Sequence, residues 1–274
     1  MNFIEESIFR ILFIINHKNK IKFTHMINNV TLIGSGNLAT QIGIAFKQSK
    51  ITINQVYSKD VKNAKKLSKK LKCKFTNKIK EIEIKELGII CIKDDYISKI
   101  ADKIPNKPIV HTSGSTNINT LNKFKKHGVI YPIQTLNKNK KANFTKIPIC
   151  VEANTKLFEK ELNVLCKKIS NNVINVKSNK RLNIHIAAVM CNNFTNQIIN
   201  RAEHILKKQN LSFEILLPII DETFKKIQNP KTRLQKTGPA IRKDYKIIKK
   251  HIEELEGLDK KIYNIISKQI MSDE

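Results

Sequence analysis

Val-Thr-Leu-Ile-Gly-Ser-Gly-Asn-Leu-Ala, residues 30–39, is the stretch that decides the fold. It runs from an apolar strand through a glycine turn into a helix whose apolar spacing extends to Gln48. In this context Gly34 permits a tight turn, Gly36 lets backbone amides approach a pyrophosphate, and Ala39 packs the helix against the strand. The positive end of the helix dipole favours phosphate at the same place. The stretch therefore predicts a dinucleotide-binding turn, made of Gly34, Ser35, Gly36, Asn37, Leu38 and Ala39; a turn that only joins strand to helix is the alternative.

Strands and helices alternate after this turn, which predicts an α/β domain with a Rossmann-type parallel sheet. The expected strands are Val30–Gly34, Ile53–Tyr57, Leu87–Ile92, Pro108–His111, Gly128–Tyr131 and, closing the sheet, Ile147–Val151. The expected helices between them are Leu38–Gln48, Val61–Leu71, Ile97–Lys103 and Leu121–Lys126. Residues 27–154 are therefore expected to form the dinucleotide-binding domain.

The second half of the chain has a helical pattern, with few strand-like segments after about Asn154. The expected helices are Leu157–Ile169, residues 180–209, Phe213–Gln228 and, after a Gly238-Pro239 loop, Ile241–Ile270. An all-α domain over residues 155–274 follows from this pattern. Residues 1–26 form an N-terminal extension, which is either an appended helix or the product of a start codon assigned ahead of Met26.

Composition and charge exclude several classes of protein. No apolar run approaches the ~20 residues of a membrane-spanning helix, and acidic residues stand where a secretory signal is basic, so a cytoplasmic protein without a membrane partner is expected. The formal charge of +28 invites a polyanionic partner, but the lysines are spread along the chain and aromatic residues make up only 6%. No specific nucleic-acid partner is therefore expected. The five cysteines lack a Cys-x-x-Cys pair, which indicates reduced thiols rather than disulfides or a metal site.

The residues after the second strand bear on the choice of cofactor. An NAD-preferring domain places Asp or Glu there to bond the ribose hydroxyls. This chain has Ser58 and Lys59 instead, and a hydroxyl beside an ammonium group suits a 2′-phosphate, which favours NADP(H) over NAD(H). Two alternatives stay open: Asp60 opposes this preference if the strand ends two residues later, and Lys59 is ordinary solvated surface in so lysine-rich a chain.

Polar residues follow two later strands of the predicted sheet, at the edge where ligands bind. Lys93 lies after one strand, and the loop His111-Thr112-Ser113-Gly114-Ser115 lies after the next. This loop is suited to hold a nicotinamide carboxamide or a substrate oxygen, with Lys93, His111 and Thr112 assigned to the cofactor, Ser113 to catalysis and Ser115 to the substrate. The alternative is a helix cap with a strand-end histidine. Residues 131–135, Tyr-Pro-Ile-Gln-Thr, are further candidates to line the same site.

The long helix of the second half carries His185, Asn192 and Asn196 at spacings that place them on one face. A polar trio on an otherwise apolar helix is costly to bury unless a partner bonds to it. A histidine there is able to exchange a proton with a carbonyl or imine, and asparagine is able to orient the substrate. An interhelical polar network is the alternative. Arg242, in a Thr-Gly-Pro-Ala-Ile-Arg segment, is a candidate to grip an anionic group of the substrate.

These segments together resemble one family. They are residues 34–39, 56–59, 93–95, 111–115, 131–135, 237–240 and the helix from His185 to Asn196. The family is that of Rossmann-like oxidoreductases whose C-terminal helical domain is of unknown function, found notably among Bacteroidetes. The chain is more distantly similar to pyrroline-5-carboxylate reductase, the deazaflavin-dependent NADP reductases and the 6-phosphogluconate and β-hydroxyacid dehydrogenases. The resemblance implies a helical domain that mediates dimerisation and completes the active site. Because His185 stands where the hydroxyacid enzymes carry Lys, the resemblance leaves the substrate open.

The leading hypothesis from the sequence is an NADP(H)-dependent oxidoreductase that transfers hydride to or from a small carbonyl or imine substrate in a cleft between its domains. His185 is its acid or base, and Asn192 and Ser113 position the substrate. The predicted substrate-binding residues are Asn196, Ser115 and Arg242, and a homodimer is expected. A non-catalytic NADP(H)-binding sensor or assembly protein is the alternative, with a nucleic-acid binder as a third reading.

Overall fold

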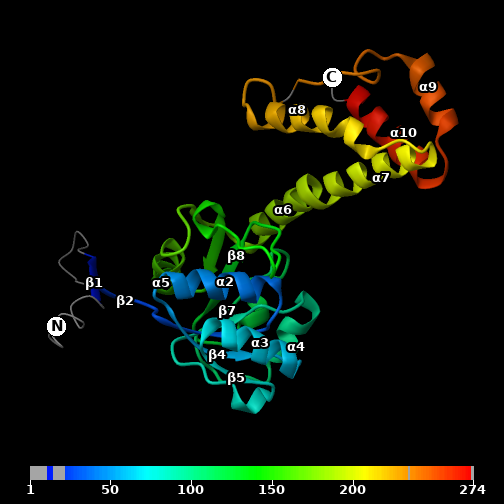
Figure 1. Cartoon of the computed structure of the whole chain (residues 1–274). Helices are drawn as coiled ribbons and strands as arrows, with labels where there is room; N and C mark the ends of the chain where they lie inside the picture. The colour runs from blue at the N-terminus through cyan, green and yellow to red at the C-terminus, as the bar shows by residue number, and fades with distance from the viewer. Residues whose placement is uncertain (1–10, 15–21, 234, 273–274) are drawn as a thin grey trace. The chain divides into compact units, whose positions relative to one another are not determined.

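A computed structural model describes residues 11–14, 22–233 and 235–272 of the chain. The strands of its main sheet are β3 (Asn29–Ile33), β4 (Thr52–Tyr57), β5 (Lys74–Thr76), β6 (Leu87–Ile90), β7 (Ile109–His111), β8 (His127–Pro132), β9 (Ile149–Ala153) and β10 (Val173–Asn175). They pair in the order β10-β9-β8-β7-β6-β3-β4-β5. Four of these strands, β4, β5, β7 and β8, are labelled in Figure 1.

Six of these strands form the parallel core of a Rossmann sheet. From β3 the chain moves outward to β4 and β5, returns to the other side of β3 at β6, and moves outward again to β7 and β8, with every neighbouring pair parallel. β9 then pairs antiparallel with β8, and β10 pairs parallel with β9. The topological switch lies between β3 and β6, so ligands are expected beyond the C-terminal ends of these two strands.

Buried side chains on both faces of the sheet explain the helical layers. Within β3, Leu32 packs in one apolar cluster and Ile33 in the other, as the alternation of strand side chains requires. The first cluster includes residues of α2 (Asn37–Gln48), α3 (Val61–Leu71) and α5 (Lys156–Lys167). The second includes residues of α4 (Ile97–Ala101) and Leu121 of the 3₁₀ turn η3 (Ile118–Leu121). The predicted α/β sandwich around the glycine turn is confirmed.

Two expectations about the elements around the sheet were wrong, and two strands were missed. No α-helix covers Leu121–Lys126: the bonds there run from residue i to i+3, as in Phe124 N–H to Leu121 O at 3.0 Å, and the segment is too short to continue as a helix. The strand expected at Ile147–Val151 exists as β9, but it does not close the sheet because β10 pairs with its outer edge. β5 and β10 themselves, three residues each, were not predicted.

The helix considered for residues 1–26 falls mostly outside the described residues. The parts of this stretch that are described form strands: β1 (Ile11–Ile14) and β2 (Lys22–His25) pair antiparallel.

The chain divides into two compact units, one ending at Asn192 and the other starting at Asn193. The first unit holds the sheet, α5 and also α6 (Ser178–Val189). The long helix expected over residues 180–209 is interrupted by a π-helical turn, Met190–Phe194, where the division falls.

Among its described residues, the second unit contains helices and no strand. It contains α7 (Thr195–Lys208), α8 (Leu217–Gln228), α9 (Tyr245–Glu254) and α10 (Gly257–Ser272). The single helix expected over Ile241–Ile270 is two helices, because the backbone is extended at Leu255. Across the described ranges, no helix combines the length and the apolar character needed to cross a membrane.

Candidate active site at the C-terminal edge of the sheet

The turn after β3 contains glycine for a steric reason. Gly34 has a φ of +130°, and a Cβ atom there would lie 2.2 Å from the carbonyl oxygen of Cys91. Its N–H donates to the carbonyl oxygen of Tyr57 at 2.8 Å. The ends of β3, β4 and β6 thus meet at one residue, and the fold itself requires glycine there.

Gly36, the N-cap of α2, is a different case. Its φ of −75° is open to any residue, and a Cβ atom added to it would meet nothing within 4 Å. Contacts within the protein therefore do not require glycine at this position. The lack of a side chain on Gly36 leaves open space beside the first N–H groups of α2. Backbone amides and the helix dipole at such a helix N-terminus favour an anionic group. Asn37 Oδ1 accepts the N–H of Lys138 at 3.2 Å, which leaves its Nδ2 to donate to a ligand.

The residues after β4 are arranged around the same turn. The hydroxyl of Ser35 donates to that of Ser58 at 2.7 Å, which ties the glycine turn to the end of β4. Asp60 caps α3: its two carboxylate oxygens accept the backbone and side-chain N–H groups of Asn63, at 3.0 and 2.7 Å. The carboxylate that would oppose a 2′-phosphate is therefore engaged elsewhere, whereas Lys59 is exposed.

One carboxylate organises the loop that follows β7. Asp94 Oδ2 accepts the hydroxyls of Ser113, at 2.6 Å, and Ser115, at 2.5 Å. The Ser113 oxygen in turn accepts the N–H groups of Ser115, at 3.1 Å, and Thr116, at 2.9 Å. The hydroxyl of Ser113 therefore has its donor and both acceptor positions occupied, and it shapes the loop. Lys93, which precedes this carboxylate, is exposed.

His111 and Thr112 are enclosed at the base of the loop. Thr112 donates its hydroxyl to the carbonyl of Ile90 at 3.0 Å, and His111 Nδ1 accepts the N–H of Ser113 at 3.2 Å. Burial lowers the pKa of His111 to about 4; the charge of Arg181 acts in the same direction, while Asp94 and the backbone of Asn117 oppose it. His111 is therefore a neutral ring inside the fold at neutral pH.

His185 comes from α6 but lies against this loop. Its Nδ1 is 3.0 Å from the hydroxyl oxygen of Tyr131, and the two rings meet edge to face with centroids 5.7 Å apart. A Cβ atom on Gly114 would lie 2.7 Å from both Cγ and Nδ1 of His185, so only glycine lets the ring approach the loop this closely. Within the described part of the chain, Nε2 of His185 has no hydrogen-bond partner. The ring is held on one side and available on the other.

A buried ion pair anchors α6 at the sheet. Arg181 is fully buried, and its guanidinium group bonds to Glu152 of β9 and to the carbonyl oxygen of Thr116. Glu152 also accepts the N–H and the hydroxyl of Ser178, at 3.0 and 2.7 Å. Because His185 follows Arg181 by four residues, the two lie on one face of α6. The anchor therefore determines where His185 stands.

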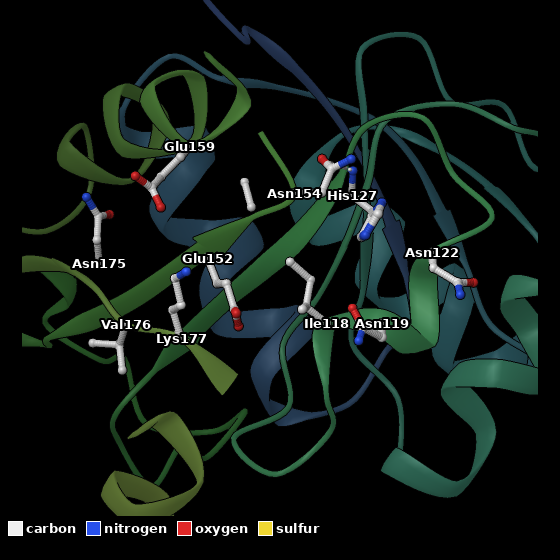
Figure 2. Close-up of a pocket in the computed structure, with 11 residues that line it drawn as sticks. Ile118, Asn119, Asn122, His127, Glu152, Asn154, Glu159, Asn175, Val176 and Lys177 are labelled. Carbon is white, nitrogen blue, oxygen red and sulfur yellow. Dashed lines mark hydrogen bonds between the residues drawn. The ribbon is translucent and has the colours of Figure 1, made fainter. Parts of the chain in front are cut away.

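Glu152 also lines a cavity of about 460 Å³ (Figure 2). Ile118, Asn119 and Lys177 are among its lining residues. None of the site residues predicted from the sequence lines it. The cavity is thus separate from the cluster around His185.

The remaining predicted residues divide between the two units. Asn192 Nδ2 donates to the hydroxyl of Thr135 at 2.7 Å. Thr135 belongs to residues 131–135, the segment that also contains Tyr131, the partner of His185. Asn196 and Arg242 belong to the second unit and are exposed; Asn196 accepts a hydrogen bond from the side chain one turn later in α7. A role for these two residues stays a prediction.

Sequence reasoning assigned no role of their own to four contributors to the site: Asp94 and Tyr131, whose segments it singled out, and Arg181 and Glu152, which it missed. Two of them had a signal. Glu152 is the one charged residue in the strand Ile-Cys-Val-Glu-Ala, and Arg181 precedes His185 by one helical turn. The hydrogen bonds that the two serines donate to Asp94 depend on the β6–β7 pairing and have no local signature.

Comparison with known proteins agrees with this geometry. Residues 147–270 match the model of a domain of unknown function, DUF2520. A solved structure from Bacteroides fragilis, described as an NADP oxidoreductase, is 33% identical, covers 89% of this chain and 98% of its own, and superposes with a TM-score of 0.80. The chain belongs to this Rossmann-like oxidoreductase family.

More distant structures share the fold of the family. A Thermotoga maritima protein is 18% identical, with 88% of this chain and 97% of that chain covered and a TM-score of 0.73. The 1-pyrroline-5-carboxylate reductase of Streptococcus pyogenes is 14% identical, with 89% and 98% covered and a TM-score of 0.62. No protein of curated function matches the chain.

Proposed function

We propose that this oxidoreductase uses NADP(H) and reduces, or in reverse oxidises, a small carbonyl or imine compound. The observation that carries the proposal is His185, held at Nδ1 and open at Nε2, at the edge of the sheet where the glycine turn also lies. A bound nicotinamide would supply or accept the hydride. Nε2 of His185 exchanges the proton with the oxygen or nitrogen of the substrate. Ser113 and Asp94 hold the loop against which the histidine rests, and Asn192 orients the substrate.

Several observations support the choice of cofactor. The open space at Gly36 and the N–H groups of α2 suit the pyrophosphate. Ser58 and the exposed Lys59 suit a 2′-phosphate, and Asp60 is engaged in capping α3. The Bacteroides fragilis relative is described as an NADP oxidoreductase. The imine class has support from the names of two distant structural relatives, a pyrroline-5-carboxylate reductase and an imine reductase of Streptomyces aurantiacus.

The cofactor proposal is tested by reversing the charge at one position. We expect Lys59→Glu to weaken NADPH binding by about tenfold or more, because a charge-assisted bond to the 2′-phosphate is replaced by repulsion, and to change NADH binding little. Titration by nicotinamide fluorescence, at low and raised salt, measures both. Lys62→Glu, the same change at an exposed position of α3, controls for the loss of overall positive charge. Equal weakening of NADPH and NADH binding by Lys59→Glu would contradict the preference.

We also propose that the protein is a homodimer assembled through its second unit. Among the described residues of that unit only Ala240, Ile248 and Ser267 are buried, whereas large apolar side chains such as Ile219 and Leu258 are 65% and 72% exposed. Helices with so little internal core need a further apolar surface to cover them. Sedimentation velocity is expected to give twice the mass of one chain, and a monomer at all micromolar concentrations would refute the assembly.

A further inference from the structure

We propose that Tyr131 is a positioning residue for His185. Its phenol hydroxyl bonds to Nδ1 of the imidazole, so that proton exchange with the substrate goes through Nε2. The inference rests on the proposed function of His185. It adds to that function the atom that exchanges the proton and the residue that selects it.

The direction of the hydrogen bond follows from the atom that exchanges the proton. Among the described residues, the hydroxyl of Tyr131 has His185 Nδ1, at 3.0 Å, as its hydrogen-bond partner. A neutral imidazole has one N–H group and one acceptor nitrogen, so a ring that takes up a proton at Nε2 carries its own proton on Nδ1. The Nδ1–H group then donates to the phenol oxygen.

Tyr131 is suited to this role because it remains a hydroxyl. Burial raises the pKa of Tyr131; Cys150 and Asp94 act in the same direction, and Arg181 opposes them. A hydroxyl, unlike a carboxylate or an ammonium group, accepts as well as donates. Its oxygen is therefore able to accept the Nδ1–H group in both the neutral and the charged state of the ring.

The loop after β7 lies close to the ring of His185. Gly114 lies so close that an added Cβ atom would be 2.7 Å from Nδ1 and 2.9 Å from Cβ of His185. A flipped ring would bring Cδ2 to the hydroxyl of Tyr131 and lose the hydrogen bond. During reduction, the charged ring gives its Nε2 proton to the substrate heteroatom and keeps its proton on Nδ1, which stays bonded to the phenol oxygen.

The chain contains a matched pair for comparison. In the second unit, the hydroxyl of Tyr263 lies 2.7 Å from Nδ1 of His251, and the rings meet edge to face with centroids 5.6 Å apart. This pair has the same local geometry as Tyr131 and His185. Tyr263→Phe therefore reports what loss of a tyrosine partner does to a histidine ring that has no assigned role in the reaction.

The test measures the imidazole nitrogens directly, by ¹⁵N NMR of histidine-labelled full-length protein, with His185→Gln used to assign the signals. We expect the neutral ring of His185 to be a single Nδ1–H tautomer in the wild type and a tautomer mixture in Tyr131→Phe. Tyr263→Phe should change the signals of His251 and leave those of His185 unaltered. An Nε2–H tautomer in the wild type, or identical His185 signals with and without the Tyr131 hydroxyl, would overturn the inference. This readout needs no substrate, so it is independent of the proposed reaction.

Kinetics supply a second readout once a substrate is known. Tyr131→Phe is expected to lower kcat by about tenfold, part of the 10²–10⁴ that a placed acid or base contributes, with the KM for the cofactor unchanged. A merely structural role would instead alter the unfolding midpoint and leave the histidine tautomer as it was. An unchanged kcat in this variant would contradict the assignment.

Discussion

His185→Gln is expected to lower kcat by roughly 10²- to 10⁴-fold, the usual contribution of a placed general acid or base. Glutamine keeps a polar group near the hydroxyl of Tyr131 but cannot take up and release a proton. The cofactor turn is built from other elements, so NADPH affinity should remain within about twofold of the wild type. Steady-state rates with the carbonyl or imine that the wild-type enzyme turns over, together with fluorescence titration, measure the two effects separately.

Two variants sharpen this experiment. Gly114→Ala leaves the imidazole intact but places a Cβ atom 2.7 Å from its ring, so the ring must move and activity should fall without loss of cofactor binding. His204→Gln makes the same chemical change at an exposed position of α7 and should have no effect on the rate. If His185→Gln retains full activity, the proton is exchanged by another group and the proposed role is wrong.

The free energy of unfolding is expected to fall by roughly 3 kcal/mol as the pH is lowered through the range set by His111. The pKa of this buried ring is lowered from 6.5 to about 4 in the folded protein. Below pH 6.5 the unfolded chain therefore binds a proton that the folded chain does not. The stability that the neutral His111 ring gives the folded protein is fully present above pH 6.5. It declines as the pH falls toward 4 and is lost below pH 4. Urea unfolding at intervals between pH 7.5 and 4 measures it.

His111→Asn provides the comparison, because its side-chain oxygen is able to accept the N–H of Ser113 but does not titrate. This variant is expected to be less stable at neutral pH and to have a flatter dependence on pH between 6.5 and 4. Equal slopes for the variant and the wild type would mean that other groups cause the acid sensitivity. The difference between the two curves isolates one ring among the seven histidines of the chain.

The parts of the fold that could be predicted are those that have a local cause. Residues 30–39 predicted the turn because each glycine has its own steric or ligand-related reason, and α3 begins and ends where its apolar spacing and its Asp60 cap indicate. β5 and β10 could not be predicted, because three residues are too few to display an alternation. Pairing with β4 and β9 creates them, and that pairing is a property of the whole sheet.

The candidate site divides in the same way. His185 stood out because a polar residue on an apolar helix face needs a reason. Its neighbours Tyr131 and Gly114 come from two other elements, and their contacts with it depend on how α6 lies across the strands. Asp94 illustrates the limit well: its segment was noticed, but only the adjacency of β6 and β7 reveals that two serines from the next loop share one of its oxygens.

The anchoring of α6 also determines which changes in chain length this protein tolerates. Four residues of helix advance roughly 6 Å, about the length of two residues of strand, so Arg181 meets the level of Glu152 and His185 meets the level of Tyr131. One residue inserted between Arg181 and His185 would turn the histidine by roughly 100° about the helix axis and away from its partner. The connections between strands can lengthen over evolutionary time, but this single helical turn cannot, and its length should be invariant wherever the reaction is retained.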